Sequence, residues 1–245
     1  MQRYKIELSY DGTEYAGWQV QPNGITVQEK LEWALREITG ERPRVHGSGR
    51  TDQGVHARRQ VAHFDLKPAK RPEALCTGLN AVLPSDIRVL TVKPADAGFH
   101  ARKSAVSKEY RYFIWNGDVV PPFLVRYRTQ VRKPLDAAAM ARAAGFLEGK
   151  HDFAAFTANP NREVESTVRR LSELRVGAKG PEIVIKARAD GFLYKMVRSL
   201  AGFLMRVGEG AVEPGRVKTV IASRRRTARV PTAPPQGLFL WNVKY

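Results

Sequence analysis

The chain opens with an alternation of apolar and polar side chains. Four apolar residues between Tyr4 and Tyr10 are separated by single charged or polar residues, and the alternation ends at Asp11-Gly12. A period of two is typical of a strand with one buried face, and Asp-Gly is a frequent turn. The pattern therefore predicts a first strand over residues 3–10.

A helical period follows this turn. Thr26 and Glu29 have the spacing of a capping box, in which each side chain accepts a hydrogen bond from the other residue's backbone, and Gly40 is a typical helix end. Between them, the apolar residues recur every three or four positions. We expect a helix whose buried face is formed by Val27, Leu31, Ala34, Leu35 and Ile38.

The same two periods continue to the end of the chain. They predict strands over 60–66, 87–92, 109–115, 167–176, 182–189 and 239–245, and helices over 72–83, 134–147, 191–206 and 214–222. Because the strand and helix pattern restarts near residue 105, we expect two halves, 1–104 and 105–245. The fold class is α+β: two sequential α/β-sandwich halves of the RRM or ferredoxin-like kind, sharing a mostly antiparallel mixed sheet, with an active-site cleft between them.

Composition and charge narrow the range of partners. The chain has 245 residues, with 41 Lys and Arg against 24 Asp and Glu, which gives a net charge of +17. Such a charge favours a polyanionic partner, above all nucleic acid. No apolar run approaches the roughly 20 residues of a membrane span, so we expect a cytoplasmic protein without a membrane segment. Cys76, the single cysteine, excludes an internal disulfide.

The segment His46–Ala57 carries the best candidate chemistry. It combines three glycines and two histidines with Arg50 and Asp52. Glycines allow close approach of the backbone to a ligand, and in an extended segment the side chains of Arg50 and Asp52 point the same way. The alternative is an ordinary glycine-rich loop with a capping Asp.

The predicted helix over 191–206 has two unlike faces. Leu193, Val197, Leu200 and Leu204 form an apolar stripe, and Lys195, Arg198, Gly202 and Arg206 lie roughly opposite. The basic side is either a solvated face or a source of an arginine that meets Asp52 and holds this carboxylate ionised.

Other chemistries lack their residues. The five histidines show no HExxH spacing and have no cysteine partners, so a metal site is not expected. The loop at Gly47–Arg50 lacks the Gly-Lys-Ser/Thr of a phosphate-binding P-loop, so ATP use is not indicated. The run Arg224–Arg229 is either a solvated loop or a nonspecific contact to phosphates.

Several motifs occur in an order that resembles the tRNA pseudouridine synthase A family over essentially the whole chain. They are Gly49–Ala57, Gly78–Ala81 before Leu83-Pro84, Phe99–Arg102, Lys108–Tyr112, Gly191–Leu193 with Met196–Arg198, and Gly237–Leu240. The resemblance implies isomerisation of uridine to pseudouridine at positions 38, 39 and 40 of the tRNA anticodon stem-loop, by a homodimer without a cofactor.

The resemblance also implies roles for matching residues. Asp52 falls on the catalytic aspartate, Arg198 on its basic partner, and Tyr110 on the tyrosine that stacks on the target base. Arg50 falls on the arginine linked to drawing out the nucleotide. The substrate-binding candidates are Arg50, Tyr110, Leu238, Lys195 and His56.

The reaction suits these residues, because it needs no redox change and no energy input. Asp52 would attack C1′ or C6 of the nucleotide, or abstract a sugar proton, and the sequence does not choose among the three. The base must be extruded, at a cost of a few kcal/mol, and stacking on Tyr110 recovers roughly 1 to 3 kcal/mol. The Tyr110 hydroxyl is a candidate to remove the C5 proton.

Two other functions fit the same composition. A non-catalytic RRM-like module would also have α+β halves with basic faces and strand tyrosines, although no segment fits the RNP1 pattern. A ribosome-associated structural protein would bind rRNA without turnover. Neither of these has a use for Asp52.

Overall fold

The computed structural model describes residues 1–158 and 165–245, which form two compact units. The N-terminal unit comprises Met1–Val106 together with Phe239–Tyr245, and the C-terminal unit comprises Ser107–Leu238. The chain thus passes between units after Val106 instead of 104, and the last strand, which we expected in the second half, belongs to the first. Hydrogen bonds explain its place: Val106 N–H donates to Lys244 O at 2.8 Å, and the Tyr245 hydroxyl donates to Ala101 O at 2.7 Å.

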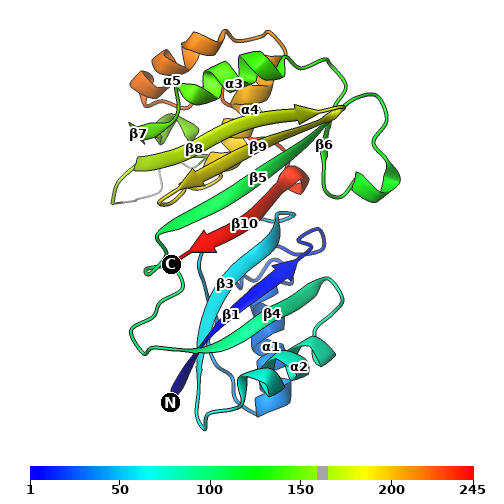
Figure 1. The fold of residues 1–245 in the computed structure, drawn as a ribbon, viewed down its shortest axis with the longest axis vertical. Helices are drawn as coiled ribbons and strands as arrows, with labels where there is room; N and C mark the ends of the chain where they lie inside the picture. Colours follow the sequence, from blue (N-terminus) through cyan, green and yellow to red (C-terminus); the bar gives the residue numbers. More distant parts are fainter. Residues whose placement is uncertain (159–164) are drawn as a thin grey trace. The chain divides into compact units, whose positions relative to one another are not determined.

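The N-terminal unit contains strands in the order β4-β1-β3-β10 (Figure 1), and a short strand β2 pairs with β3. Its elements are β1 (Gln2–Tyr10), α1 (Val27–Thr39), β2 (His46–Gly47), β3 (His56–Leu66), α2 (Pro72–Val82), β4 (Ile87–Ala95) and β10 (Leu238–Lys244). All these pairs are antiparallel except β10 with β3, which is parallel.

The two periods predicted from the sequence are present in this unit. Along β1, the apolar residues from Tyr4 to Tyr10 are buried, and the residues between them are partly exposed. Helix α1 has the expected capping box, with Glu29 N–H donating to Thr26 Oγ1 at 3.3 Å and Thr26 N–H to Glu29 Oε2 at 3.4 Å. Gly40 ends the helix at a φ of +77°. These local signals therefore set both the position and the buried face of the first two elements.

The strands of the C-terminal unit follow one another in the order β5-β9-β8-β7, with β6 beside β5. Its longer elements are β5 (Ser107–Asn116), β6 (Thr129–Val131), α3 (Ala137–Gly145), β7 (Gly149–Asp152), β8 (Val168–Lys179), β9 (Glu182–Ala189), α4 (Met196–Gly208) and α5 (Val217–Ser223). Among the strand pairs that the structure describes in this unit, only β5–β6 is parallel. The predicted class, α+β with a mostly antiparallel mixed sheet, is confirmed.

Helix α4 differs from its prediction in start and surroundings. It begins at Met196, because Lys195 adopts a left-handed conformation with φ of +55° and so interrupts the helix that we expected from residue 191. Gly202, assigned to the basic face, is buried and packs so tightly against Pro231 O that a Cβ would not fit. The segment before β10 therefore covers this side of the helix at Arg198 and Gly202, whereas Arg206 is exposed.

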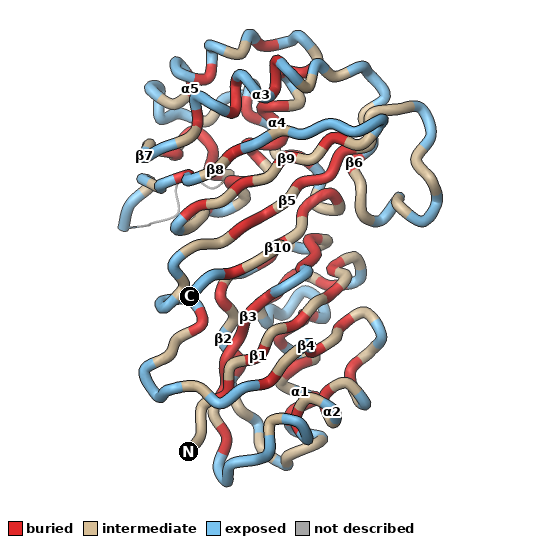
Figure 2. The backbone as a smooth tube through the Cα atoms, in the orientation of Figure 1, coloured by how far each residue is buried: buried red, intermediate tan, exposed pale blue. Residues whose placement is uncertain are grey.

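Several strands and helices also begin or end at residues other than the predicted ones. Strand β3 begins at His56, four residues before the predicted start, and is buried over most of its length (Figure 2). The short strands β2, β6 and β7 were not predicted. Two to four residues are too few to show a period of two, so these strands are defined by their partners alone. The expected strand at 109–115 and helix at 72–83 lie within one or two residues of β5 and α2.

Candidate active site

Asp52 lies in the connection between β2 and β3 of the N-terminal unit. Thr51 is buried, Asp52 is partly exposed, and Arg50 is exposed, so the two charged side chains flank a buried anchor. A turn follows at once: Val55 N–H donates to Asp52 O at 3.1 Å, and Gly54 has a φ of +74° that L side chains rarely adopt. The loop therefore presents a carboxylate at a fixed bend directly before a buried strand.

A second segment, Asp11–Trp18, holds this bend from the other side. Trp18 N–H donates to Thr51 O at 3.0 Å, and Gly54 N–H donates to Tyr15 O at 3.4 Å. Gly12 comes so close to Val55 O that no side chain fits there. Sequence reasoning interpreted Asp11-Gly12 only as a turn. The missed signal is the pair Gly12 and Gly17, five residues apart between β1 and α1, which indicates close backbone approach.

His56 lies beneath the loop, where it is fully buried. Its ring stacks on Phe239 of β10 with centroids 4.6 Å apart. Its Nδ1 atom is 3.0 Å from both Gly12 N and Asp11 Oδ1, and one nitrogen cannot accept from the first and donate to the second at once. We assign Nδ1 as the acceptor for Gly12 N–H, because Asp11 Oδ1 already accepts from Thr13 N–H and Oγ1. His56 thus links the segment before α1 to the start of β3.

Tyr110 lies on β5 in the C-terminal unit, opposite Ala187 of β9. It is 7% exposed, and its ring meets Phe192 edge to face at 5.1 Å. Alternation along the strand places Tyr110 on the same face as Tyr112 and separates it from Glu109. The ring is therefore in edge-to-face contact with an aromatic neighbour from the segment that precedes α4.

Arg198 lies in the first turn of α4 and is partly exposed. Its Nε donates to Ala233 O at 2.7 Å, and Ala233 N–H donates to Arg198 O at 3.0 Å, so side chain and backbone bind the same residue. Its charge acts on the nearby Tyr112 hydroxyl, whose pKa is raised by burial and lowered by Thr129 and Arg198. The position of this guanidinium is thus fixed by the segment that leads into β10.

Lys195 and Leu238 are the other two predicted site residues of the C-terminal unit. Lys195 is not on α4 but precedes it, and its Nζ lies 4.9 Å from the centroid of the Tyr194 ring. Leu238 is 5% exposed and begins β10, directly after Gly237, where a Cβ would lie 2.7 Å from Phe113 O. The predicted site residues therefore form two groups, one in each unit: Arg50, Asp52 and His56, and Tyr110, Lys195, Arg198 and Leu238.

The basic run Arg224–Arg229 is not uniform. Arg224 is exposed and pairs with Asp152 at 3.2 Å. Arg226 instead reaches inward, donating to Thr157 O at 3.2 Å, Ser199 Oγ at 2.7 Å and Thr232 Oγ1 at 2.7 Å. Burial lowers its pKa. Arg226 is thus a structural residue of the C-terminal unit, which neither interpretation of the run anticipated.

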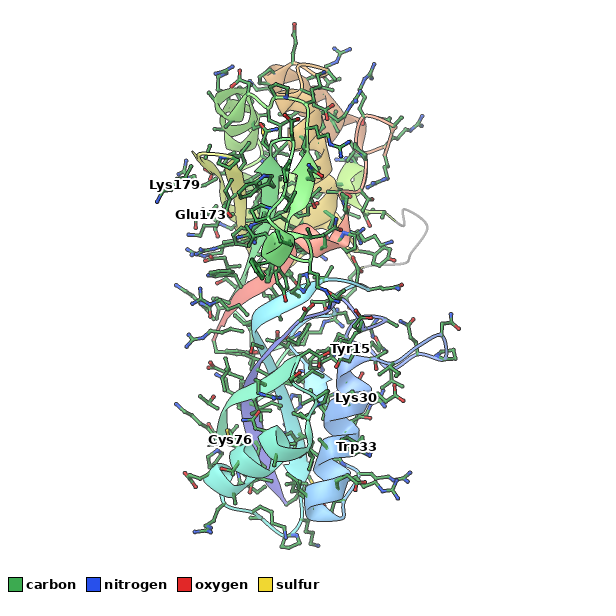
Figure 3. All side chains as sticks on the ribbon, turned by 90° about the vertical axis from the view of Figure 1, so that its right-hand side faces the viewer. Tyr15, Lys30, Trp33, Cys76, Glu173 and Lys179 are labelled. Carbon is green, nitrogen blue, oxygen red and sulfur yellow. The ribbon has the colours of Figure 1, made fainter. Side chains whose placement is uncertain are left out.

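Other features of the described chain add no second site. Within residues 1–158 and 165–245, no three His, Cys, Asp or Glu side chains gather in a way that would hold a metal ion. No helix in the same ranges is long and apolar enough to cross a membrane. A hollow of about 360 Å³ on the N-terminal unit contains none of the predicted site residues; Tyr15, Lys30 and Trp33, three of its lining residues, are labelled in Figure 3.

Known proteins resemble this chain over its full length. A profile of the tRNA pseudouridine synthase family matches residues 8–102 and 143–245. Proteins named tRNA pseudouridine synthase A from Brevibacillus brevis and Pelobacter propionicus are each 44% identical over 245 residues, with all of both chains covered. The protein of that name from Moorella thermoacetica is 45% identical, with 98% of each chain covered. The chain therefore belongs to the tRNA pseudouridine synthase family, and it is an isomerase that acts on tRNA.

Proposed function

We propose that this chain converts uridine to pseudouridine at positions 38, 39 and 40 of the tRNA anticodon stem-loop, as a cytoplasmic homodimer without a cofactor. The observation that carries the proposal is the placement of Asp52, a partly exposed carboxylate on a loop held by backbone hydrogen bonds. The motif around it matches that family, and the charge of +17 suits a polyanionic substrate.

Asp52 supplies the chemistry in this proposal. Uracil must leave C1′, turn while still bound, and rejoin through C5, so atoms and electrons balance without a redox partner. An ionised carboxylate either attacks C1′ or C6 or removes a sugar proton. Because binding rests on many phosphate contacts and chemistry on this one group, Asp52 is a catalytic residue and not a general RNA contact.

Tyr110 and Arg50 handle the nucleotide. The target base must leave its stack, which costs a few kcal/mol, and an aromatic platform returns roughly 1 to 3 kcal/mol. Tyr110 is suited to this platform because the edge contact with Phe192 fixes its ring. Arg50, exposed and two residues before Asp52, is proposed to help draw out the nucleotide by binding a phosphate near it. Leu238, Lys195 and His56 are proposed to support substrate binding around these groups.

Arg198 is proposed to pair with Asp52 during catalysis and to keep it ionised. The anchoring of its Nε to Ala233 O supports the proposal, because a held guanidinium loses little freedom on pairing. Arg198→Ala tests it, because loss of the partner of the catalytic carboxylate should lower the single-turnover rate at saturating enzyme beyond any loss of tRNA affinity. A simple loss of affinity with an unchanged single-turnover rate would contradict the pair.

The direct test of function is release of tritium from C5-labelled uridine in unmodified tRNA. We expect tritium release with this protein alone. The amount released should fall with each of the uridines 38, 39 and 40 that is replaced by cytidine. A protein that only binds RNA would give none, and full release from the triply replaced tRNA would contradict the proposed positions. The mass in small-angle scattering tests the homodimer, and a fully active monomer would contradict it.

A further inference from the structure

A set of buried hydrogen bonds lies beneath the loop of Asp52, and its centre is Gln60 on β3. Gln60 and Ser48 have no exposed surface, and Tyr10 and Thr51 are nearly as buried. The Gln60 Oε1 atom accepts from Ser48 Oγ at 2.6 Å and from Val61 N–H at 3.2 Å. The Gln60 Nε2 atom donates to Gly49 O at 2.9 Å and to the Tyr10 hydroxyl at 3.5 Å.

This set uses the full hydrogen-bonding capacity of one amide. A Gln side chain offers two acceptor positions and two N–H donors, and all four are occupied here. The assignment of Oε1 and Nε2 is fixed by two of these contacts, because a flipped amide would place Nε2 against Val61 N–H and Oε1 against the Gly49 carbonyl oxygen. A buried polar network that is fully satisfied is rigid, and one that loses a member is costly.

The network reaches both sides of Arg50. Gln60 binds the carbonyl of Gly49 directly. It reaches Thr51 through Tyr10, whose hydroxyl is 2.8 Å from Thr51 Oγ1. Burial raises the pKa of Tyr10, so its hydroxyl keeps its proton. Gly49 and Thr51 are the residues that flank Arg50, and Thr51 is bonded covalently to Asp52.

We propose that Gln60 is a positioning residue that sets the geometry of Arg50 and Asp52 through Gly49 and Thr51, with Tyr10 as its relay. The proposal rests on the proposed function, in which Asp52 acts on the nucleotide. Neither Gln60 nor Tyr10 contacts substrate in this account. A shift of about 1 Å in a catalytic group costs up to roughly 10²-fold in rate, so a small relaxation of the loop is enough to be measured.

The test compares matched amide-to-carboxylate changes at two sites of the same unit. Gln60→Glu removes the donor to Gly49 O. Asn80→Asp removes a similar donor, because Asn80 Nδ2 binds Val89 O at 2.8 Å between α2 and β4. We expect both variants to unfold at lower temperature, and only Gln60→Glu to lose roughly 10- to 10²-fold in single-turnover rate at saturating enzyme, with tRNA affinity within about threefold.

A pH profile tests whether the rate of Gln60→Glu recovers at low pH, which general destabilisation would not produce. Burial favours the neutral form of the introduced carboxyl, and its O–H then donates to Gly49 O in place of Nε2. The ratio of the Gln60→Glu rate to the parent rate, for folded protein at saturation, is therefore expected to rise as the pH falls. For Asn80→Asp the same ratio should stay near one.

If Gln60→Glu does not fold, Tyr10→Phe tests the proposal instead. It removes only the relay hydroxyl, and we expect a loss of roughly threefold or more in single-turnover rate with tRNA affinity unchanged. An unchanged rate in the folded variants, or an equal loss in Asn80→Asp, would overturn the proposal. The failure of the proposed function is seen separately, because Asp52→Asn would then retain the parent rate whatever Gln60 does.

Discussion

Gly17 and Thr51 are in direct backbone contact. A Cβ atom on Gly17 would lie 2.6 Å from the Thr51 carbonyl oxygen, and the N–H of the next residue, Trp18, donates to that same oxygen at 3.0 Å. Gly17 has a φ of +100°, which favours glycine. The residue before Asp52 is thus fixed by a segment more than thirty positions earlier in the chain.

Gly17→Ala is expected to lower the single-turnover rate by about 10²-fold, because the methyl group displaces Thr51 and with it Asp52. It also strains a positive φ, so unfolding free energy should fall by more than about 1 kcal/mol. Gly40→Ala is the control, since Gly40 has a φ of +77° but nothing within 4 Å of its Cβ position. A rate loss in the control equal to that in Gly17→Ala would contradict the account.

The fold was predictable where local signals agree. The alternation at Tyr4 to Tyr10 and the capping box at Thr26 and Glu29 gave correct elements, because each depends on neighbours within a few residues. The start of α4 was not predictable in this way, because the pattern of apolar residues continues through Lys195 although the backbone there is left-handed. The placement of β10 in the N-terminal unit depends on partners far away in sequence.

The candidate site shows the same division. The loop carrying Arg50 and Asp52 was identified from its glycines and charges. The residues that hold this loop were not identified, because Gln60 and Tyr10 look like ordinary strand residues in the sequence. Only the folded chain brings them to Gly49 and Thr51. Arg226 was grouped with exposed arginines for the same reason, because sequence alone does not distinguish a solvated arginine from a partly buried one that hydrogen-bonds within the fold.

The arginines of the run 224–229 are expected to separate into two behaviours. Affinity for tRNA should fall steeply as the salt concentration rises. For each phosphate that the protein contacts, the slope of log K against log salt should be roughly −0.7 to −0.9. Arg225→Glu, at an exposed position, should make this slope shallower. Arg226→Leu should instead lower the unfolding temperature by several degrees, because three hydrogen bonds are lost. The reverse pattern in binding and melting measurements would contradict the assignment.

Acid is expected to destabilise the N-terminal unit through His63. Burial lowers the pKa of His63 from 6.5 to about 4, aided by the charges of His100, His46 and Arg3 and opposed by Asp65. The unfolded chain therefore binds this proton first, and stability falls as the pH drops from about 6.5 toward 4. Urea unfolding across this range should show the loss. His63→Asn, which keeps an acceptor for Ala101 N–H, should reduce this loss of stability at low pH. A loss in the variant as large as in the parent would contradict the prediction.

Tyr110→Phe separates stacking from proton transfer. It retains the aromatic face and the contact with Phe192, so tRNA affinity should survive. If the hydroxyl assists removal of the C5 proton, product formation should slow by roughly 10² to 10⁴-fold, and a deuterium isotope effect at C5 should appear. Tyr110→Ala should additionally weaken binding. If Tyr110→Phe has the parent rate and no isotope effect, the role of Tyr110 is limited to stacking on the base.

The most direct measurement of the central claim is single-turnover tritium release by Asp52→Asn on unmodified tRNA, with tRNA affinity determined in parallel. The substitution keeps the size of the side chain on the Thr51–Val55 bend and removes only its charge and basicity. We predict that release is abolished while affinity stays within a few-fold, because phosphate contacts carry binding and one carboxylate carries chemistry. Release near the parent rate would contradict the account.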